Sequence, residues 1–263
     1  EQMYSDFEDY GWSSGTYCQK VYQGYTTKIE KDVVISTWQS IYKMPKKYFE
    51  QFGCVIGDEA HMFKAKSLTG IMTKLHQCKY RFGLTGTLDG TQTHKLVLEG
   101  LFGAAEKVVS TKDLIDKKTL ANLKIKCITL KHPNIRQKMT YAEELDYIVS
   151  KESRNKFILD LCNTLNGNTL CLFQLVEKHG KVLYDGMKGS ENVYFVYGGT
   201  DTEQRERIRG LVEGHRKSTT IASYGTFSTG INIRNINNIV LASPSKSKIR
   251  VLQSIGRGLR ISS

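Results

Sequence analysis

The sequence predicts an α/β protein built from two successive units with mainly parallel sheets. Short apolar runs alternate with segments of helical periodicity, once over residues 32–85 and again over residues 152–259. The runs are rich in β-branched residues and do not alternate with polar residues, which is typical of parallel strands covered on both faces. A length of 263 residues is enough for two domains of ordinary size. Strand–helix order repeated in two series therefore favours two layered α/β units.

The first series contains three candidate strands and two candidate helices. The strands are residues 32–36, 54–58 and 80–85, and the helices are residues 37–43, with Pro45 as an interruption, and 65–75. Because the strands are apolar and bounded by turn residues, we expect them to be buried. Cys54 in this series and Cys171 in the second lie inside such strands, where a thiol behaves as a small hydrophobe.

The second series predicts four strands and four helices. The strands are residues 168–173, 192–197, 218–222 and 238–242, and the helices are 154–165, 175–187, 201–213 and one that carries residues 253–259. Between the two series, residues 107–149 are basic and less periodic, which we interpret as an edge hairpin and a crossover. The expected domains are residues 1–130, with a linker to about residue 150, and residues 151–263.

The charge of the chain favours a polyanionic partner. The sequence has 38 lysines and arginines against 26 aspartates and glutamates, a formal net charge of +12. Such a balance suits phosphate neutralisation and counterion release, although it also serves solubility. The basic residues are spread along the chain, which fits a folded basic surface better than a disordered arm.

Cysteine usage and hydropathy restrict the compartment. The six cysteines lie far apart, without a C-x-x-C pair or a histidine at ligand spacing, so we expect a reducing cytoplasm and no structural zinc. No apolar run approaches the roughly 20 residues of a membrane helix, and no signal peptide is recognisable, so no membrane partner is expected.

A pair of carboxylates, Asp58 and Glu59, ends the apolar run 54–57 in the string Asp-Glu-Ala-His, which closes with His61. A carboxylate at the carboxyl end of a parallel strand projects into the crevice where α/β folds bind ligands. Asp58 is placed to serve Mg²⁺, and Glu59 to orient or deprotonate an attacking water. A bare Asp-Glu pair is more often a solvated turn, but the four-residue string on such a strand favours the catalytic interpretation.

Two further strand ends carry small hydroxyl residues. Thr85-Gly86-Thr87 follows the third predicted strand of the first series, where small residues permit close backbone approach and hydrogen bonding. Residues 223–232 follow the strand 218–222 as a Gly/Ser/Thr loop, which would expose backbone N–H groups to phosphates. Each segment read alone is compatible with a plain turn.

The last candidate is Gln253-Ser254-Ile255-Gly256-Arg257-Gly258-Leu259-Arg260. Arg257 and Arg260 are spaced i, i+3, so on a helix they face the same way. Arginine is suited to bidentate phosphate contact and to neutralising charge on a transferring phosphoryl group. A solvated basic helix end is the alternative for loose arginines, and the Q-x-x-G-R-x-x-R pattern is more specific than that.

These four motifs, in this order, resemble motifs II, III, V and VI of superfamily-2 helicases, and within them the recombination helicases of T-even bacteriophages. The segment 36–40, Ser-Thr-Trp-Gln-Ser, also resembles the stretch of the first domain that touches the nucleic-acid backbone in this family. The resemblance covers nearly the whole chain. It implies two RecA-like domains that bind ATP and Mg²⁺ and act on DNA.

The resemblance also assigns roles to individual residues. By it, Asp58 holds Mg²⁺ through water and Glu59 serves the hydrolytic water, while His61 with Thr85 and Thr87 couples the nucleotide to the other domain. Further nucleotide contacts are implied for Gly230 and for Gln253, Arg257 and Arg260. Nucleic-acid contacts are implied at Thr37, Gln39, Gly199 and Thr226.

The sequence departs from the family pattern in three respects. It has no G-x-x-x-x-G-K-[ST] phosphate-binding loop, it carries Asn232 where many relatives have aspartate, and it stops at Ser263 shortly after the arginine motif. We expect the chain to be a fragment that lacks the front of the first domain. On its own it should then show negligible ATP turnover.

Several functions remain open at this level. The first is an ATP-driven DNA helicase that acts as a monomer on junctions, stalled forks and R-loops. Its further partners would be RNA in R-loops and other recombination proteins. It would act in the host cytoplasm if the protein is viral. A DEAH-type RNA helicase is the second, although that class usually carries Ser-Ala-Thr at the third motif. For the chain alone, a nucleic-acid-binding or annealing module without turnover is the third. A restriction-enzyme motor would need a nuclease motif that the sequence does not show.

Overall fold

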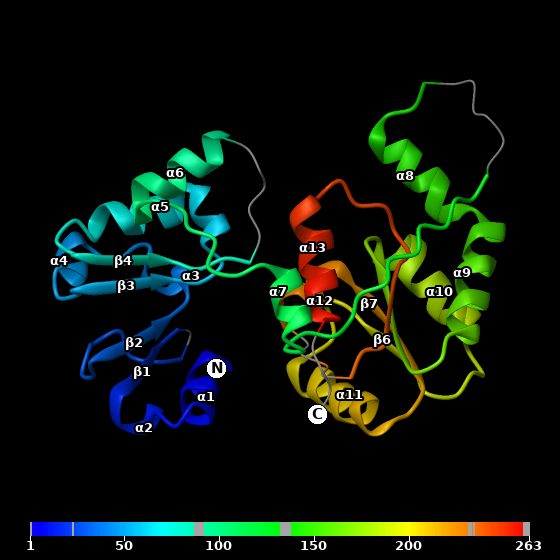
Figure 1. The fold of residues 1–263 in the computed structure, drawn as a ribbon, viewed down its shortest axis with the longest axis horizontal. Coiled ribbons are helices and arrows are strands. Elements are labelled where there is room, and N and C mark those ends of the chain that lie inside the picture. The colour runs from blue at the N-terminus through cyan, green and yellow to red at the C-terminus, as the bar shows by residue number, and fades with distance from the viewer. Residues whose placement is uncertain are drawn as a thin grey trace. The chain divides into compact units, whose positions relative to one another are not determined.

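A computed structural model describes residues 2–22, 24–86, 92–131, 138–230, 233 and 235–259. The chain divides into two compact units, Glu1–Glu106 (unit 1) and Lys107–Ser263 (unit 2). Figure 1 labels the helices and most of the strands of both units. Every strand pair in the described residues is parallel, which confirms the predicted α/β class with mainly parallel sheets.

Unit 1 holds two short parallel sheets. Its elements are α1 (Gln2–Asp9), α2 (Ser14–Tyr17), β1 (Cys18–Val21), β2 (Val33–Ser36), α3 (Trp38–Ile41), α4 (Lys46–Phe49), β3 (Cys54–Gly57), a 3₁₀ helix (Ala60–Lys64), α5 (Lys66–Lys74), β4 (Tyr80–Gly83) and α6 (Gln92–Phe102). Strand β1 pairs with β2, and β3 pairs with β4 with Ile56 opposite Phe82. The three predicted strands are present, and α1, α2, β1, α4, the 3₁₀ helix and α6 are additional.

The β3–β4 sheet is covered on one face only. The covered face packs on a cluster that includes Phe49, Phe63 and Met72, drawn from α4, the 3₁₀ helix and α5. The opposite face exposes Cys54, Ile56, Tyr80, Phe82 and Leu84. The expectation of buried strands is therefore wrong for this sheet, where Ile56 is 63% and Phe82 52% exposed. Cys54 is likewise a surface thiol and not part of the core.

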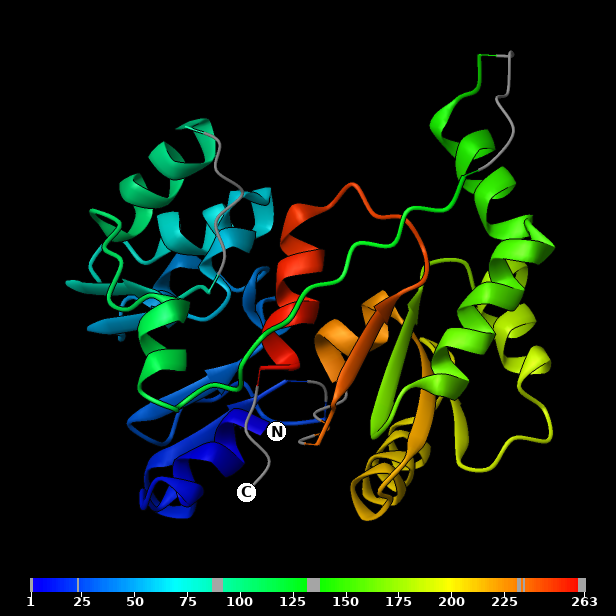
Figure 2. The same ribbon diagram turned by 45° about the vertical axis from the view of Figure 1, so that its right-hand side comes forward.

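Unit 2 is built on a four-stranded parallel sheet in the order β6-β7-β5-β8. Its elements are α7 (Thr111–Asp116), α8 (Tyr141–Ser150), α9 (Glu152–Thr164), β5 (Asn168–Phe173), a π-helix (Val176–Gly180), α10 (Lys181–Gly186), β6 (Val193–Val196), α11 (Thr202–Gly214), β7 (Ser218–Ser223), α12 (Tyr224–Gly230), β8 (Asn238–Leu241) and α13 (Lys248–Arg257). Figure 2 shows this sheet with helices on both sides. All four carboxyl ends meet at one edge, where open α/β sheets bind ligands.

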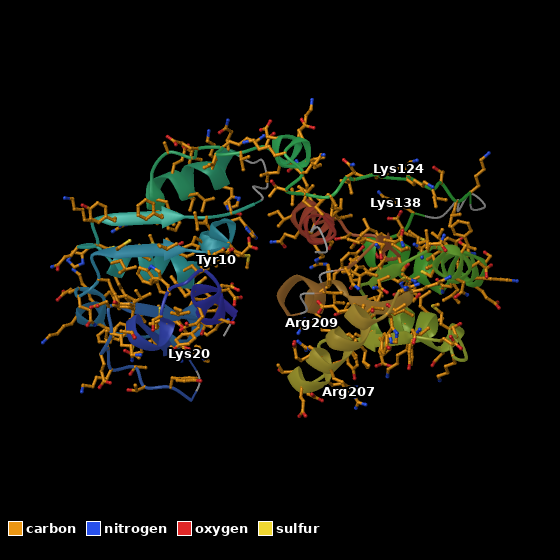
Figure 3. The ribbon with its side chains drawn as sticks, turned by 60° about the horizontal axis from the view of Figure 1, so that its bottom comes forward. Tyr10, Lys20, Lys124, Lys138, Arg207 and Arg209 are labelled. Atoms are coloured by element: carbon orange, nitrogen blue, oxygen red, sulfur yellow. The ribbon has the colours of Figure 1, made fainter. Side chains whose placement is uncertain are left out.

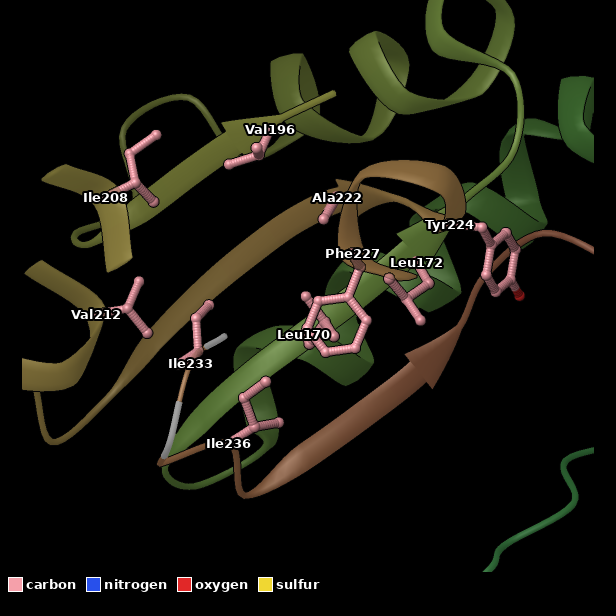
Figure 4. Close-up of a cluster of buried hydrophobic side chains, with 10 residues drawn as sticks. All are labelled: Leu170, Leu172, Val196, Ile208, Val212, Ala222, Tyr224, Phe227, Ile233 and Ile236. Carbon is pink, nitrogen blue, oxygen red and sulfur yellow. The ribbon is translucent and has the colours of Figure 1, made fainter. Parts of the chain in front are cut away.

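The sheet of unit 2 lies between two hydrophobic clusters. On one face, Leu170 and Leu172 pack against Val212 of α11 and Phe227 of α12, as Figure 4 shows. On the other face, Phe173 packs with Leu183 and the residues of α9. Leu172 is fully buried. Burial on both faces matches the unalternating apolar pattern of these strands.

The segment between the two series differs from its prediction. The described parts of residues 107–149 contain α7 and α8 and no strand, so the expected edge hairpin is wrong. Both helices begin with a capping box: Ser110 with Asp113, and Thr140 with Glu143. In each box, the first side chain accepts the N–H of the fourth residue and that residue's carboxylate reaches back to the cap. These pairs are sequence signals for helix starts that outweigh the weak periodicity.

Candidate nucleotide and nucleic-acid site

The carboxylate pair forms a tight turn after β3. Asp58 and Glu59 are both exposed, and the N–H of Glu59 donates to Oδ1 of Asp58 at 2.8 Å. Glu59 adopts φ 48° and ψ 49°, in the left-handed region that residues with a Cβ rarely occupy. The Ala60 N–H bonds to the carbonyl of Leu84 at 2.8 Å, so the turn is fixed to the end of β4. A strained turn of this kind is typical of functional sites.

Two glycines let aromatic rings close on the sheet beneath this turn. Gly57 and Gly83 are paired across β3 and β4. A Cβ on Gly57 would lie 2.8 Å from the ring of Phe63, and one on Gly83 would lie 2.9 Å from the ring of Phe102. Both distances are shorter than side chains tolerate, so a larger residue at either position would displace these rings. The 3₁₀ helix that follows Glu59 is held by this packing.

His61 joins the carboxylate turn to the Thr-Gly-Thr segment. Its ring is 4% exposed, with Nδ1 at 3.1 Å from Oγ1 of Thr85 and at 3.2 Å from Oε2 of Glu59. Because an ionised carboxylate only accepts, a hydrogen bond to Glu59 requires the proton on Nδ1. The structure thus brings together three of the predicted site residues in unit 1. Thr87 lies outside the described residues.

A second histidine holds the backbone of His61 in place. His94 of α6 is buried, and its Nε2 lies 2.9 Å from the backbone carbonyl of His61. The bond fixes the backbone on which the His61 ring is mounted. His94 belongs to none of the motifs, and α6 itself was not predicted, so the sequence reasoning missed it. An isolated histidine in a helix gives no sequence signal for such a role.

Thr37 and Gln39 follow β2, at the start of α3. Both side chains are exposed, and the Thr37 hydroxyl bonds to that of Ser40 at 2.9 Å. Ser36 donates to the carbonyl of Val21 at 2.7 Å, which ties the end of β2 to β1. The two residues predicted to contact nucleic acid are therefore accessible at a strand end.

In unit 2, Gly199 lies in a compact turn after β6. The Thr200 hydroxyl accepts from the N–H of Tyr197 at 3.1 Å, and Arg205 donates to the carbonyl of Gly198 at 3.0 Å. A Cβ on Gly199 would lie 2.6 Å from the Tyr197 ring, so this close approach requires glycine. Arg205 was not predicted, although it lies one helical turn after Asp201, which caps α11.

The predicted loop 223–232 is helical where the structure describes it. Residues Tyr224–Gly230 form α12, and the Ser223 hydroxyl accepts from the N–H of Thr226 at 3.3 Å. Thr226 is only 4% exposed and bonds to Ser223 through its hydroxyl at 2.7 Å. The expectation of an open loop is wrong, because a serine at the strand end caps a helix. The Thr226 side chain is consequently engaged inside the protein, and Gly230 is the last described residue of α12.

The arginine motif lies on α13. The hydroxyl of Ser247 caps this helix by accepting from the N–H of Arg250 at 3.3 Å. Gln253 is half-buried in the helix, and Arg257 is its final residue. Arg260 and Asn232 lie outside the described residues. The helix begins ahead of the motif because its cap is Ser247, and it ends at Arg257, so Gly258 and Leu259 of the predicted helical segment lie beyond it.

The residues that the structure describes contain no group of three or more His, Cys, Asp or Glu side chains that could hold a metal ion. Asp58 offers a single exposed carboxylate, which suits Mg²⁺, since this ion commonly takes one or two protein carboxylates together with phosphates and water. None of the described helices is long and apolar enough to cross a membrane.

Comparison with protein families places both units in one class. A family model for the res subunit of type III restriction enzymes matches residues 1–90, and a helicase conserved C-terminal domain matches residues 142–262. Together with the DEAH turn and the arginine helix, these matches define the class. The chain belongs to the superfamily-2 helicases, with a RecA-like fold.

Individual relatives narrow this placement. The chain is similar to the ATP-dependent DNA helicase UvsW of Enterobacteria phage T4, with 38% identity over 272 residues, which cover 98% of this chain and 54% of that protein. The chain thus spans about half the length of this relative.

Two solved structures support the fold alone. A fragment of a putative HsdR subunit of a type I restriction enzyme from Vibrio vulnificus covers 93% of this chain and 47% of that chain, with a TM-score of 0.67 and 18% identity. Dbp5 of S. cerevisiae, solved with RNA and ADP BeF3, covers 98% and 66%, with a TM-score of 0.60 and 13% identity.

Proposed function

We propose that the chain forms part of an ATP-driven DNA helicase that acts on branched DNA, namely junctions, stalled forks and R-loops. The observation that carries the proposal is the contact of His61 with both Glu59 and Thr85, which joins two motifs into one site. The similarity to UvsW, described as a DNA helicase, supports DNA as the substrate. RNA in R-loops and other recombination proteins are further proposed partners. We propose that the protein acts as a monomer in the cytoplasm, which is the host cytoplasm if the protein is viral.

In this proposal, the residues of unit 1 act on the nucleotide and its water. Asp58 would hold Mg²⁺ through water, and the bound ion would neutralise phosphate charge. Glu59 would orient the attacking water and accept its proton, while His61 holds the Glu59 carboxylate in place. Because His61 also contacts Thr85, just after β4, a shift of this segment would move His61 and with it the Glu59 carboxylate. Thr87 would extend the same segment.

The residues of unit 2 would neutralise charge and respond to nucleic acid. Arg257 and Arg260 would stabilise negative charge on the γ-phosphate, with Gln253 and Gly230 beside the nucleotide. Thr37, Gln39 and Gly199 would contact the nucleic-acid backbone through exposed groups at strand ends. The side chain of Thr226 is buried, so we propose that this residue contacts nucleic acid through its backbone.

Positive charge supports a nucleic-acid partner along both units. Figure 3 marks Lys20, Lys124 and Arg207, which belong to different parts of the chain. Together with the net charge of +12, they predict binding that weakens strongly with salt, through counterion release.

The test compares ATP turnover in the presence of forked DNA and of single-stranded RNA. The sequence lacks a phosphate-binding loop, so the chain is assayed joined to a segment that supplies one. We expect forked DNA to stimulate turnover more than RNA does. Greater stimulation by RNA would support the RNA-helicase alternative, and turnover that no nucleic acid changes would exclude a helicase motor.

A further inference from the structure

A chain of buried polar side chains lies at the carboxyl edge of the unit 2 sheet, outside the family motifs. His179, in the π-helix, is fully buried. Its Nδ1 lies 2.8 Å from the hydroxyl of Ser243, just beyond β8, and its Nε2 lies 3.2 Å from Oδ1 of Asn155 on α9. Ser243 and Asn155 are also buried. Buried polar groups of this kind persist when every partner is satisfied.

The direction of each hydrogen bond follows from its partners. Asn155 donates through Nδ2 to the carbonyl of Val149 at 2.8 Å, so its Oδ1 accepts from His179. With the proton on Nε2, the Nδ1 of His179 accepts from the hydroxyl of Ser243. That hydroxyl in turn accepts from the N–H of Gln174 at 3.0 Å. These hydrogen bonds require a neutral imidazole, because a charged ring carries a proton on Nδ1 and could not accept from the Ser243 hydroxyl.

Ser243 continues this chain to the helices that carry the motifs. Its backbone carbonyl accepts from the hydroxyl of Tyr224 at 2.9 Å. Tyr224 is the first residue of α12, and its ring lies 5.9 Å from the guanidinium carbon of Arg250, in the first turn of α13. Figure 4 shows the Tyr224 hydroxyl directed towards the segment that leaves β8. One tyrosine therefore contacts the end of β8 and both motif-bearing helices.

We propose that Tyr224 and Ser243 are positioning residues that hold α12 and α13 at a fixed distance and orientation. Residues implied to contact nucleotide, Gly230, Gln253 and Arg257, lie on these two helices. The inference rests on the proposed function, because it assigns the pair to ATP turnover stimulated by DNA. The ring of Tyr224 fills the core, whereas its hydroxyl serves only the bond to Ser243. Removing the hydroxyl alone thus separates positioning from packing.

Tyr224→Phe has a matched control in Tyr194→Phe. Tyr194 packs against the same cluster, and its hydroxyl bonds to Nε2 of His215 at 2.8 Å, away from α12 and α13. Each variant loses one hydroxyl and one hydrogen bond from unit 2. We join both variants, and Ser243→Ala, to a segment that supplies the phosphate-binding loop. For each we measure kcat and KM for ATP with and without forked DNA, together with Tm.

We expect Tyr224→Phe to lower the DNA-stimulated kcat about tenfold, with KM for ATP unchanged and Tm close to that of Tyr194→Phe. Ser243→Ala keeps the backbone carbonyl that accepts from Tyr224 and removes the hydroxyl that bonds to Gln174 and His179. It should therefore lower this kcat less than Tyr224→Phe does, and the double variant should lose little more than Tyr224→Phe alone. Equal kcat for Tyr224→Phe and Tyr194→Phe would overturn the proposal.

Hydrogen exchange of the chain itself provides a second test that needs no turnover. The amides of α13 should exchange faster in Tyr224→Phe than in Tyr194→Phe, because the ring beside the first turn of α13 is no longer anchored to Ser243 through its hydroxyl. Unchanged exchange would overturn the inference even if the protein is an active helicase. Faster exchange in a protein without DNA-stimulated turnover would retain the positioning and reject the proposed function.

Discussion

The two sheets of the molecule carry similar apolar strands but are buried differently. In unit 2, β5 to β8 lie between two hydrophobic clusters, and Leu172 has no exposed surface. In unit 1, β3 and β4 are covered on one face, and Ile56 and Phe82 are exposed on the other. Strand sequence therefore predicts pairing in both units, whereas burial depends on what packs on each face. The motifs of unit 2 follow strands that are packed on both faces, whereas the DEAH turn follows a strand that is packed on one face only.

The largest expected effect is a difference in the free energy of unfolding between a core variant of unit 2 and a variant on the exposed sheet face of unit 1. Leu172→Ala should lower the free energy of unfolding of unit 2 by about 3 kcal/mol, because it removes buried methyl groups and leaves a cavity. Ile56→Ala, on the exposed face of β3, should cost less than about 0.5 kcal/mol. Both tryptophans, Trp12 and Trp38, are in unit 1, so fluorescence follows unit 1 and calorimetry follows both. Similar costs for the two variants would contradict the difference in burial.

Acid should destabilise unit 2 through His179. Burial, aided by the nearby Arg154, lowers the pKa of His179 from 6.5 to about 4. Below pH 6.5 the unfolded chain binds a proton that the folded protein does not take up until near pH 4, so stability is full above pH 6.5 and falls as pH decreases. From pH 7.5 to 5 the loss is about 2 kcal/mol. Urea unfolding at both pH values measures it, and His179→Gln should reduce this pH dependence. An unchanged dependence in His179→Gln would assign the acid sensitivity to other groups.

The site itself shows how far sequence reasoning extends. Asp58, Glu59 and His61 were predicted because strand-end carboxylates are recognisable by pattern. The contact of His61 with Thr85 joins two of the predicted motifs, and their coupling to the other unit stays a prediction. The capping of α12 by Ser223 was not anticipated, since Gly, Ser and Thr also favour loops. His94 and His179 act through contacts with residues distant in sequence, which no local pattern encodes.

Replacing His94 should have a smaller effect on the stability of unit 1. His94→Ala should cost unit 1 about 1–2 kcal/mol, because the buried carbonyl of His61 loses its donor. His76→Ala is the control, since this histidine is exposed. Tryptophan fluorescence during urea unfolding reports both. Equal midpoints for the two variants would show that the bond to His61 contributes nothing.

The smallest perturbation is chemical labelling, which leaves the sequence unchanged. Cys54 in β3 is exposed and Cys171 in β5 is buried. We expect a thiol reagent to modify Cys54 in the native protein and to reach Cys171 only on unfolding, as peptide mass spectrometry would show. If Cys171 were labelled as rapidly as Cys54 in the native protein, the strands of unit 2 would be accessible to the reagent, which would contradict their burial.

The role of Glu59 tests the central claim most directly. Glu59→Gln keeps the shape of the side chain and removes its charge, and Glu50→Gln changes an exposed glutamate of unit 1 outside the site. Joined to a segment that supplies the phosphate-binding loop, Glu59→Gln should bind forked DNA as tightly as the unchanged protein. Its DNA-stimulated ATP turnover should fall at least about 100-fold, while Glu50→Gln retains full turnover. Undiminished turnover in Glu59→Gln would contradict the account.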